Sequence, residues 1–129
     1  MYEFWTETYV GKVNGGFSCK IPPHAVRLFA VHRAQEHPQF LSSDRHVTQG
    51  AVDVKAMDWT DGKLTAKLEL VGGFPTTFRF TVPEGMSMKS VTAGDGVRVE
   101  TRSEADGRVL AVKLGAETAQ TVELSVDFQ

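Results

Sequence analysis

Five consecutive residues bring together the side-chain types of a hydrolase. Ser42, Ser43, Asp44, Arg45 and His46 supply two hydroxyls, a carboxylate, a guanidinium and an imidazole. A catalytic triad needs these groups to converge in space, whereas side chains of adjacent residues in an irregular segment diverge. The chain also has no Gly-x-Ser-x-Gly nucleophile elbow. We therefore assign no catalytic residue and expect Asp44, Arg45 and His46 to form a structural junction through hydrogen bonds. A hydrolase using Ser43, Asp44 and His46 remains a third hypothesis.

Metal chemistry and glycoside hydrolysis have little support. The histidines are His24, His32, His37 and His46. They lack the close spacing of a helical zinc motif, and no group of thiols lies near them. Asp53, Asp58 and Asp61 are close in sequence, but nothing around them would separate two carboxyl pKa values, as glycoside hydrolysis requires. We predict no metal site and no cofactor.

Aromatic rings offer a binding chemistry, because the C–H faces of sugars stack on exposed rings. The candidate platforms are Trp5, Trp59, Tyr2 and Tyr9. Trp59 is next to the Asp61-Gly62 turn, where a loop site could form. Alternatively, the tryptophans close the ends of a β-sandwich. The residues alone leave both alternatives open.

The elements that must position these side chains are β-strands. Apolar and polar residues alternate through most of residues 51–129, as in Leu64, Ala66 and Leu68. Asp61-Gly62 between two such runs predicts a hairpin. Strands that recur without a helical stretch between them are typical of an antiparallel sandwich. We predict an all-β fold, an Ig-like or Greek-key sandwich of about ten strands that includes residues 1–129 as one domain.

Charged residues within these strands are expected on the solvated face. They include Arg79, Arg98, Glu100 and Lys113, which alternate with apolar neighbours. The period of two places them opposite the core. The sequence therefore predicts that all four are exposed.

The first 50 residues differ from the rest. Residues 2–9 predict an aromatic strand, and Phe17, Cys19 and Ile21 predict a second, in which Cys19 would fill the core. Residues 25–31 (AVRLFAV) are apolar at nearly every position, which favours a strand covered on both faces. Residues 36–50 lack the alternation, so we expect a polar connector there.

Composition and charge limit the classes of partner that we expect this chain to bind. The net charge is −2, and the 14 basic residues are scattered, so nucleic acid is not an expected partner. No apolar run approaches the roughly 20 residues that cross a bilayer, so no membrane association is predicted. Glu3 and Glu7 lie where a signal peptide would be basic and then apolar, so none is predicted.

Residues 2–50 resemble part of a known family. The matching runs are YEFW (2–5), YVGKV (9–13), Phe17 and IPPHAVRL (21–28). These runs look like the closing strands of the C-terminal β-sandwich in bacterial melibiase-type α-galactosidases, which follows a (β/α)8 catalytic barrel. HPQFL (37–41) and DRHVTQG (44–50) resemble the segment that comes next in some bacterial glycosidases.

The resemblance implies a non-catalytic accessory domain whose partner is the catalytic barrel of a parent glycosidase. It implies no catalytic role for any residue here, because the barrel and its acidic residues are not part of this sequence. Such a parent would work in the periplasm or outside the cell, and a chain that begins inside a sandwich would be a shortened product. The alternative function is a carbohydrate-binding module that uses exposed aromatic residues.

Overall fold

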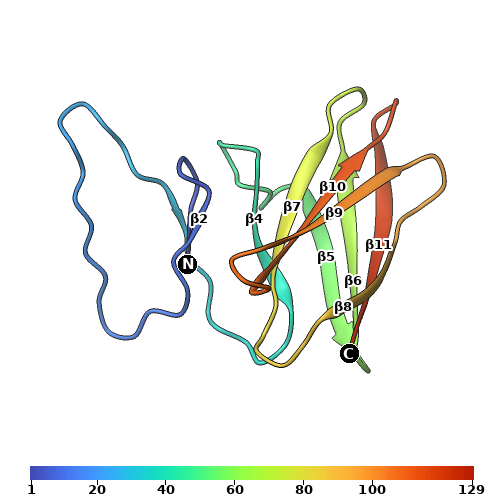
Figure 1. The fold of residues 1–129 in the computed structure, drawn as a ribbon. Helices are drawn as coiled ribbons and strands as arrows, with labels where there is room; N and C mark the ends of the chain where they lie inside the picture. The colour runs from blue at the N-terminus through green and yellow to red at the C-terminus, as the bar shows by residue number, and fades with distance from the viewer.

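The computed structural model describes residues 1–129 and contains only β-strands (Figure 1). The strands are β1 Tyr2–Glu3, β2 Thr8–Tyr9, β3 Phe29–Ala30, β4 Gln39–Ser43, β5 Val54–Thr60, β6 Lys63–Leu70, β7 Thr76–Thr81, β8 Met88–Thr92, β9 Arg98–Glu104, β10 Val109–Gly115 and β11 Gln120–Phe128. They form three antiparallel sheets with the orders β2-β1-β3, β4-β7-β10-β9 and β5-β6-β11-β8. The prediction of an all-β antiparallel sandwich of about ten strands is confirmed. The structure has no helix that is long and apolar enough to span a bilayer.

The two four-stranded sheets face each other across one apolar core of 15 buried residues. Leu64, Ala66 and Leu68 of β6 point into this core, as their alternation predicted. Phe78 and Phe80 of β7 are fully buried opposite them and are the largest side chains of the core. Each such side chain contributes about 2 kcal/mol through burial, so the sandwich carries most of the stability of the chain.

The Asp61-Gly62 hairpin is also confirmed. Both residues have positive φ angles, 50° and 79°, and Thr60 pairs with Lys63 across the turn. Two successive residues of positive φ give a type I′ turn, whose twist matches that of the strands. β5 and β6 therefore form a local hairpin at the edge of the sheet β5-β6-β11-β8.

Strand β4 lies inside the segment that the sequence predicted as a polar connector. It pairs with β7, and Leu41, Ser42 and Ser43 are buried. A bulge between Phe40 and Ser42 interrupts the register. Because the bulge breaks the period of two and two of the buried residues are serines, the strand has no recognisable alternation.

The sheet β2-β1-β3 consists of two-residue strands and lies beside the sheet β4-β7-β10-β9, on the side away from the sandwich core (Figure 1). Tyr2 and Ala30 from the small sheet make a second apolar cluster with Leu41 and Val109 of the sandwich. Residues 10–28, which connect β2 to β3, project away from the sandwich as a wide loop (Figure 1). We call residues 10–28 the flap.

Three predictions for the flap and its surroundings are wrong. Residues 17–21 form no strand, and in the run 25–31 only Phe29–Ala30 is a strand. Val26 is 66% exposed and Val31 70% exposed, so that run is not covered on both faces. Cys19 is exposed and does not fill a core. A strand needs a neighbouring backbone to pair with, whereas the only backbone hydrogen bonds of residues 12–27 are two bonds within the flap itself.

Candidate functional site

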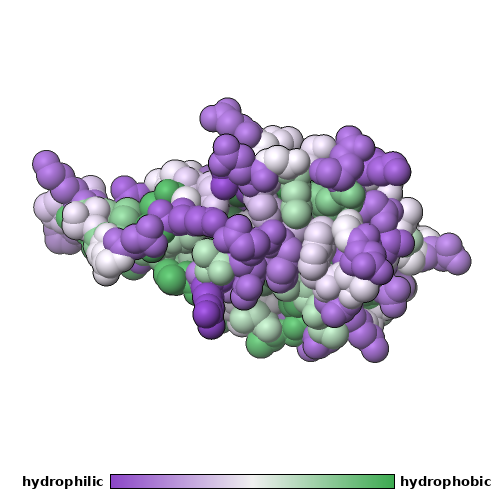
Figure 2. Space-filling view, turned by 90° about the horizontal axis from the view of Figure 1, so that it is seen from below, coloured by the Kyte–Doolittle hydropathy of each residue, from purple (hydrophilic) through white to green (hydrophobic).

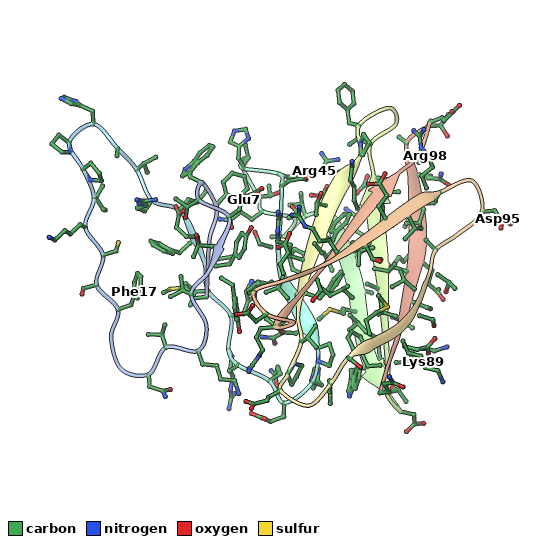
Figure 3. All side chains as sticks on the ribbon, viewed as in Figure 1. Glu7, Phe17, Arg45, Lys89, Asp95 and Arg98 are labelled. Atoms are coloured by element: carbon green, nitrogen blue, oxygen red, sulfur yellow. The ribbon has the colours of Figure 1, made fainter.

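A charged cluster holds the small sheet against the sandwich. Arg79 of β7 donates from Nε to Glu104 Oε2 at 3.1 Å and from Nη2 to Glu7 Oε1 at 3.2 Å. Its guanidinium carbon also lies 5.3 Å from the centre of the Tyr2 ring. Figure 3 shows Glu7 on the sandwich side of the small sheet. Arg79 therefore links β7, β9 and the small sheet through one side chain.

The exposure predicted for Arg79 is wrong, because this side chain is only 3% exposed. Arg98, Glu100 and Lys113 are exposed as predicted. Alternation placed Arg79 correctly on the outer face of its sheet, but the small sheet covers that face at this point. Sequence reasoning missed Arg79 as a functional residue, since nothing in its local pattern distinguishes it from the other three.

Glu3 fastens the small sheet to the end of the flap. Its side chain is 5% exposed, and Oε2 accepts hydrogen bonds from the amide of Thr6, at 2.6 Å, and from the Thr6 hydroxyl. Oε1 accepts from the amide of Leu28 at 3.3 Å, and Arg27 Nη1 lies 3.6 Å from Oε2. Burial alone would raise the pKa of Glu3, but the hydrogen bonds from Thr6 and Leu28 outweigh it and hold the pKa below its ordinary value. A carboxylate so placed stays charged and rigid.

Tyr2 lies under Arg79, and its hydroxyl is buried without a hydrogen-bond partner. Burial raises the pKa of Tyr2 from 10.0 to about 12; Arg79 opposes this shift, while Glu7 and Glu104 add to it. The native state thus keeps the phenol proton at pH values where the unfolded chain releases it. The stability that this provides is complete below pH 10.0 and is lost as the pH rises to about 12.

Replacement of Tyr2 by Phe tests that linkage. At pH 7, Tyr2→Phe should cost less than about 1 kcal/mol, because the lost hydroxyl makes no hydrogen bond. Between pH 10 and 12 the variant should lose less stability with rising pH than the parent chain, since the titrating group is gone. Urea unfolding at several pH values measures both. Tyr9→Phe is the control for loss of a tyrosine hydroxyl, and parallel alkaline curves for Tyr2→Phe and the parent would contradict the linkage.

The junction at residues 42–50 is a compact turn held by side chains. Asp44 exchanges two hydrogen bonds with the Thr77 backbone: its amide donates to Thr77 O at 3.1 Å, and its Oδ2 accepts from Thr77 N at 3.0 Å. Arg45 donates from Nη2 to Thr76 Oγ1 at 3.2 Å, and its Nε lies 3.7 Å from Oδ2 of the buried Asp53. Figure 3 shows Arg45 at the end of the sandwich near the small sheet. Asp44 and Arg45 thus connect the turn after β4 to β7.

His46 has a different position from the other two junction residues. Its ring lies 6.1 Å from the ring of Trp5, and it takes part in no hydrogen bond. The Ser43 hydroxyl accepts from the amide of Arg45 at 3.2 Å. Ser43, Asp44 and His46 make no hydrogen bonds with one another, so the turn lacks the contacts of a nucleophile, base and orienting acid.

The four aromatic candidates do not form one platform. Trp59 packs against the sandwich core, with His37 stacked on it at 5.8 Å and Phe128 edge-on at 5.8 Å. Trp5 is 53% exposed and lies beside His46. His37 and His46 flank opposite ends of β4, a strand about 16 Å long. Trp59 and Trp5 therefore lie at opposite ends of this strand. Tyr9 is half-buried in the small sheet, and Tyr2 is only 1% exposed, so the prediction of Tyr2 as a sugar platform is wrong.

The flap exposes apolar side chains. They are Val13 (40% exposed), Phe17 (46%), Ile21 (56%) and Val26 (66%). Figure 3 shows Phe17 on the flap, and Figure 2 shows hydrophobic residues among hydrophilic ones on the projecting part of the molecule. Within residues 12–27 the backbone makes only two backbone hydrogen bonds, Gly16 N to Asn14 O and Ala25 N to Pro22 O. The flap thus presents both apolar side chains and unpaired backbone groups.

Neither protein-family models nor curated proteins nor solved structures match this chain. The structure also contains no group of three His, Cys, Asp or Glu side chains that could hold a metal ion.

Proposed function

We propose that this chain is a non-catalytic accessory β-sandwich of a glycoside hydrolase similar to α-galactosidases, and that it packs against the catalytic barrel and stabilises it. The observation that carries the proposal is the flap, whose apolar side chains and unpaired backbone lie in solvent. Exposed apolar surface of this kind is typical of regions that another protein surface covers. The resemblance of residues 2–50 to the end of a glycosidase sandwich supplies the identity of the partner.

The charged cluster supports a mechanical role for the sandwich. Arg79 and the apolar contacts of Tyr2 join the small sheet to the sheet β4-β7-β10-β9. Because the flap begins and ends in the small sheet, the flap and the sandwich are connected through buried contacts as well as through the chain. A barrel that binds the flap would thereby gain the stability of the sandwich.

The test uses the enzyme in which this chain follows its barrel, identified from the reading frame upstream. Ile21→Asp and Val26→Asp each replace an exposed apolar side chain of the flap by a charged one and should lower the thermal midpoint of the barrel by several degrees. Lys20→Asp changes charge at a neighbouring exposed position and should leave the midpoint unchanged. Equal midpoints for all three variants and the parent, or an upstream frame without a barrel, would refute the proposal.

A second candidate function is carbohydrate binding centred on Trp5. Its ring is 53% exposed and is supported edge-on by Phe4 at 4.9 Å, so it could stack on a sugar. Trp59 is a poorer platform because its ring already contacts His37 and Phe128. Titration with neutral galactosides, followed by tryptophan fluorescence, should show binding that Trp5→Ala abolishes and Trp59→Phe preserves. The absence of any fluorescence change would exclude this function.

A further inference from the structure

A cleft of about 550 Å³ lies between the flap and the sandwich. The flap provides residues 11–17, and the chain that leaves β3 provides residues 31–35. The sandwich provides β4 residues, the end of β7 and Arg108 beside the β9–β10 turn. The volume is within the range of small-molecule sites. Three segments that are distant in sequence therefore form one concave surface.

The walls of the cleft carry positive charge. Lys12, Arg33 and Arg108 each come from a different one of the three segments, and none of the 20 lining residues is acidic. The whole chain has more acidic than basic residues, 16 against 14, so this segregation of charge is not a consequence of composition. Cations around a concave site attract anions, because the protein walls exclude the water that would screen them.

The carboxylates that neutralise two of these cations lie outside the cleft. Lys12 Nζ is 3.3 Å from Glu36, Arg108 Nη1 is 3.4 Å from Glu84, and both glutamate side chains are 90% exposed. Pairs with such exposed partners are weak and are readily replaced by a better-placed anion. In addition, Nε of Arg108 is buried and has no hydrogen-bond partner. A bound carboxylate would replace the exposed glutamates as the partner of Lys12 and Arg108.

Much of the cleft is already in place without a ligand. His32 Nε2 donates to Leu41 O at 2.8 Å, and Gln39 Nε2 donates to Arg33 O at 3.0 Å, so the wall of residues 31–35 is attached to β4. The backbone of Arg108 is held by Val82 N, which donates to its carbonyl at 2.8 Å. On the flap side, Phe17 packs edge-on against Phe29 at 5.4 Å. The site therefore combines two cation-bearing segments, whose backbones are held in place, with an aromatic side chain on the flap.

We propose that this cleft binds a small cyclic organic anion, specifically a hexuronic acid. Guanidinium groups bind a carboxylate through paired, charge-assisted hydrogen bonds. In this proposal Arg108 and Arg33 bind the carboxylate of the ligand, and Lys12 adds positive charge. Tyr9 and Phe17 offer ring surface to the sugar. Four uncharged polar side chains that suit the sugar hydroxyls also line the cleft: Asn14, Gln35, Gln39 and Thr81. This inference does not depend on whether the chain packs against a barrel.

Titration of the 129-residue chain with D-galacturonate, followed by calorimetry, tests the proposal. Binding should saturate and weaken as salt is added. D-Galactose has the same ring without the carboxylate and should bind roughly tenfold more weakly or not at all. Arg108→Gln and Lys12→Gln should each weaken galacturonate binding by roughly tenfold. Lys20→Gln, which removes a flap charge outside the cleft, should leave it unchanged.

Three results would overturn the proposal. They are the absence of saturable galacturonate binding, equal affinity for galactose, and equal affinity of the Arg108→Gln and parent chains. A thermal melt of each variant separates loss of binding from loss of folding, and Arg33→Gln provides a second variant should Arg108→Gln fail to fold. Inorganic sulfate that displaces galacturonate at equal concentration would show binding of charge alone and would refute recognition of the ring.

Discussion

Arg79→Ala is expected to destabilise the chain by about 3 kcal/mol and to free residues 1–35 from the sandwich. The side chain is 3% exposed and hydrogen-bonds two carboxylates while covering the Tyr2 ring. Its removal leaves Glu104, whose side chain is only 17% exposed, beside Arg102 alone and withdraws the bond to Glu7. It also opens a gap under Tyr2. The loss should exceed that of any exposed ion pair in the chain.

Two measurements locate the effect of Arg79→Ala. Urea unfolding gives the loss of stability, and limited proteolysis shows whether cleavage within residues 1–35 becomes faster than cleavage in the sandwich. Arg102→Ala is the matched control, since Arg102 binds the same Glu104 but is exposed and lies outside the contact with Tyr2. It should leave both the urea midpoint and the proteolysis pattern unchanged. Similar behaviour of the two variants would mean that Arg79 does not hold the small sheet.

Gly50→Ala is expected to destabilise the chain by about 3 kcal/mol through crowding under the turn after β4. Gly50 has a φ of +86°, and a Cβ there would lie 2.7 Å from Cζ of Phe40 and 2.9 Å from Oγ of Ser43. The backbone has little freedom to move, because the amides of Asp53 and Val54 both donate to Gly50 O. The added methyl group would thus clash with Phe40 and Ser43, and the hydrogen-bonded backbone of Gly50 could not shift to relieve the clash.

The control for Gly50→Ala is Gly107→Ala. Gly107 has a nearly identical φ of +84°, but no atom lies within 4 Å of the position that its Cβ would take. This variant therefore isolates the cost of the left-handed backbone, about 1 kcal/mol. The difference between the two free energies of unfolding measures the crowding by Phe40 and Ser43. Equal losses of stability in Gly50→Ala and Gly107→Ala would show that Phe40 and Ser43 move aside without a cost in free energy.

Taken together, these contacts explain why residues 42–50, despite their hydrolytic residue types, have a structural position. Asp44 and Arg45 bind β7, while Ser43 and Gly50 pack together beneath the turn. The surfaces for which we propose functions are elsewhere, in the flap and its cleft. The proposals for docking and for anion binding share the flap residues Val13 and Phe17 but are tested with different variants, at Ile21 and Val26 for docking and at Lys12 and Arg108 for anion binding.

The sequence by itself determined the class of fold and the pairing of local strands. Alternation in β6 and the Asp61-Gly62 turn act over a few residues, because pleat and turn geometry depend only on the adjacent backbone. The same alternation correctly set which side of the sheet Arg79 occupies. These features could be predicted since they need no knowledge of the rest of the chain.

Only the tertiary structure decided what covers each face. Arg79 became buried because Glu7, 72 positions away, lies with the small sheet over its side of β7. Phe17 and Ile21 have the pattern of a strand but form none, since pairing requires a neighbour that this chain does not place beside them. Trp59 packs into the sandwich core because Phe128 and His37 meet there from distant segments. Burial and strand pairing depend on contacts between residues that are remote in sequence, and a local sequence pattern does not encode these contacts.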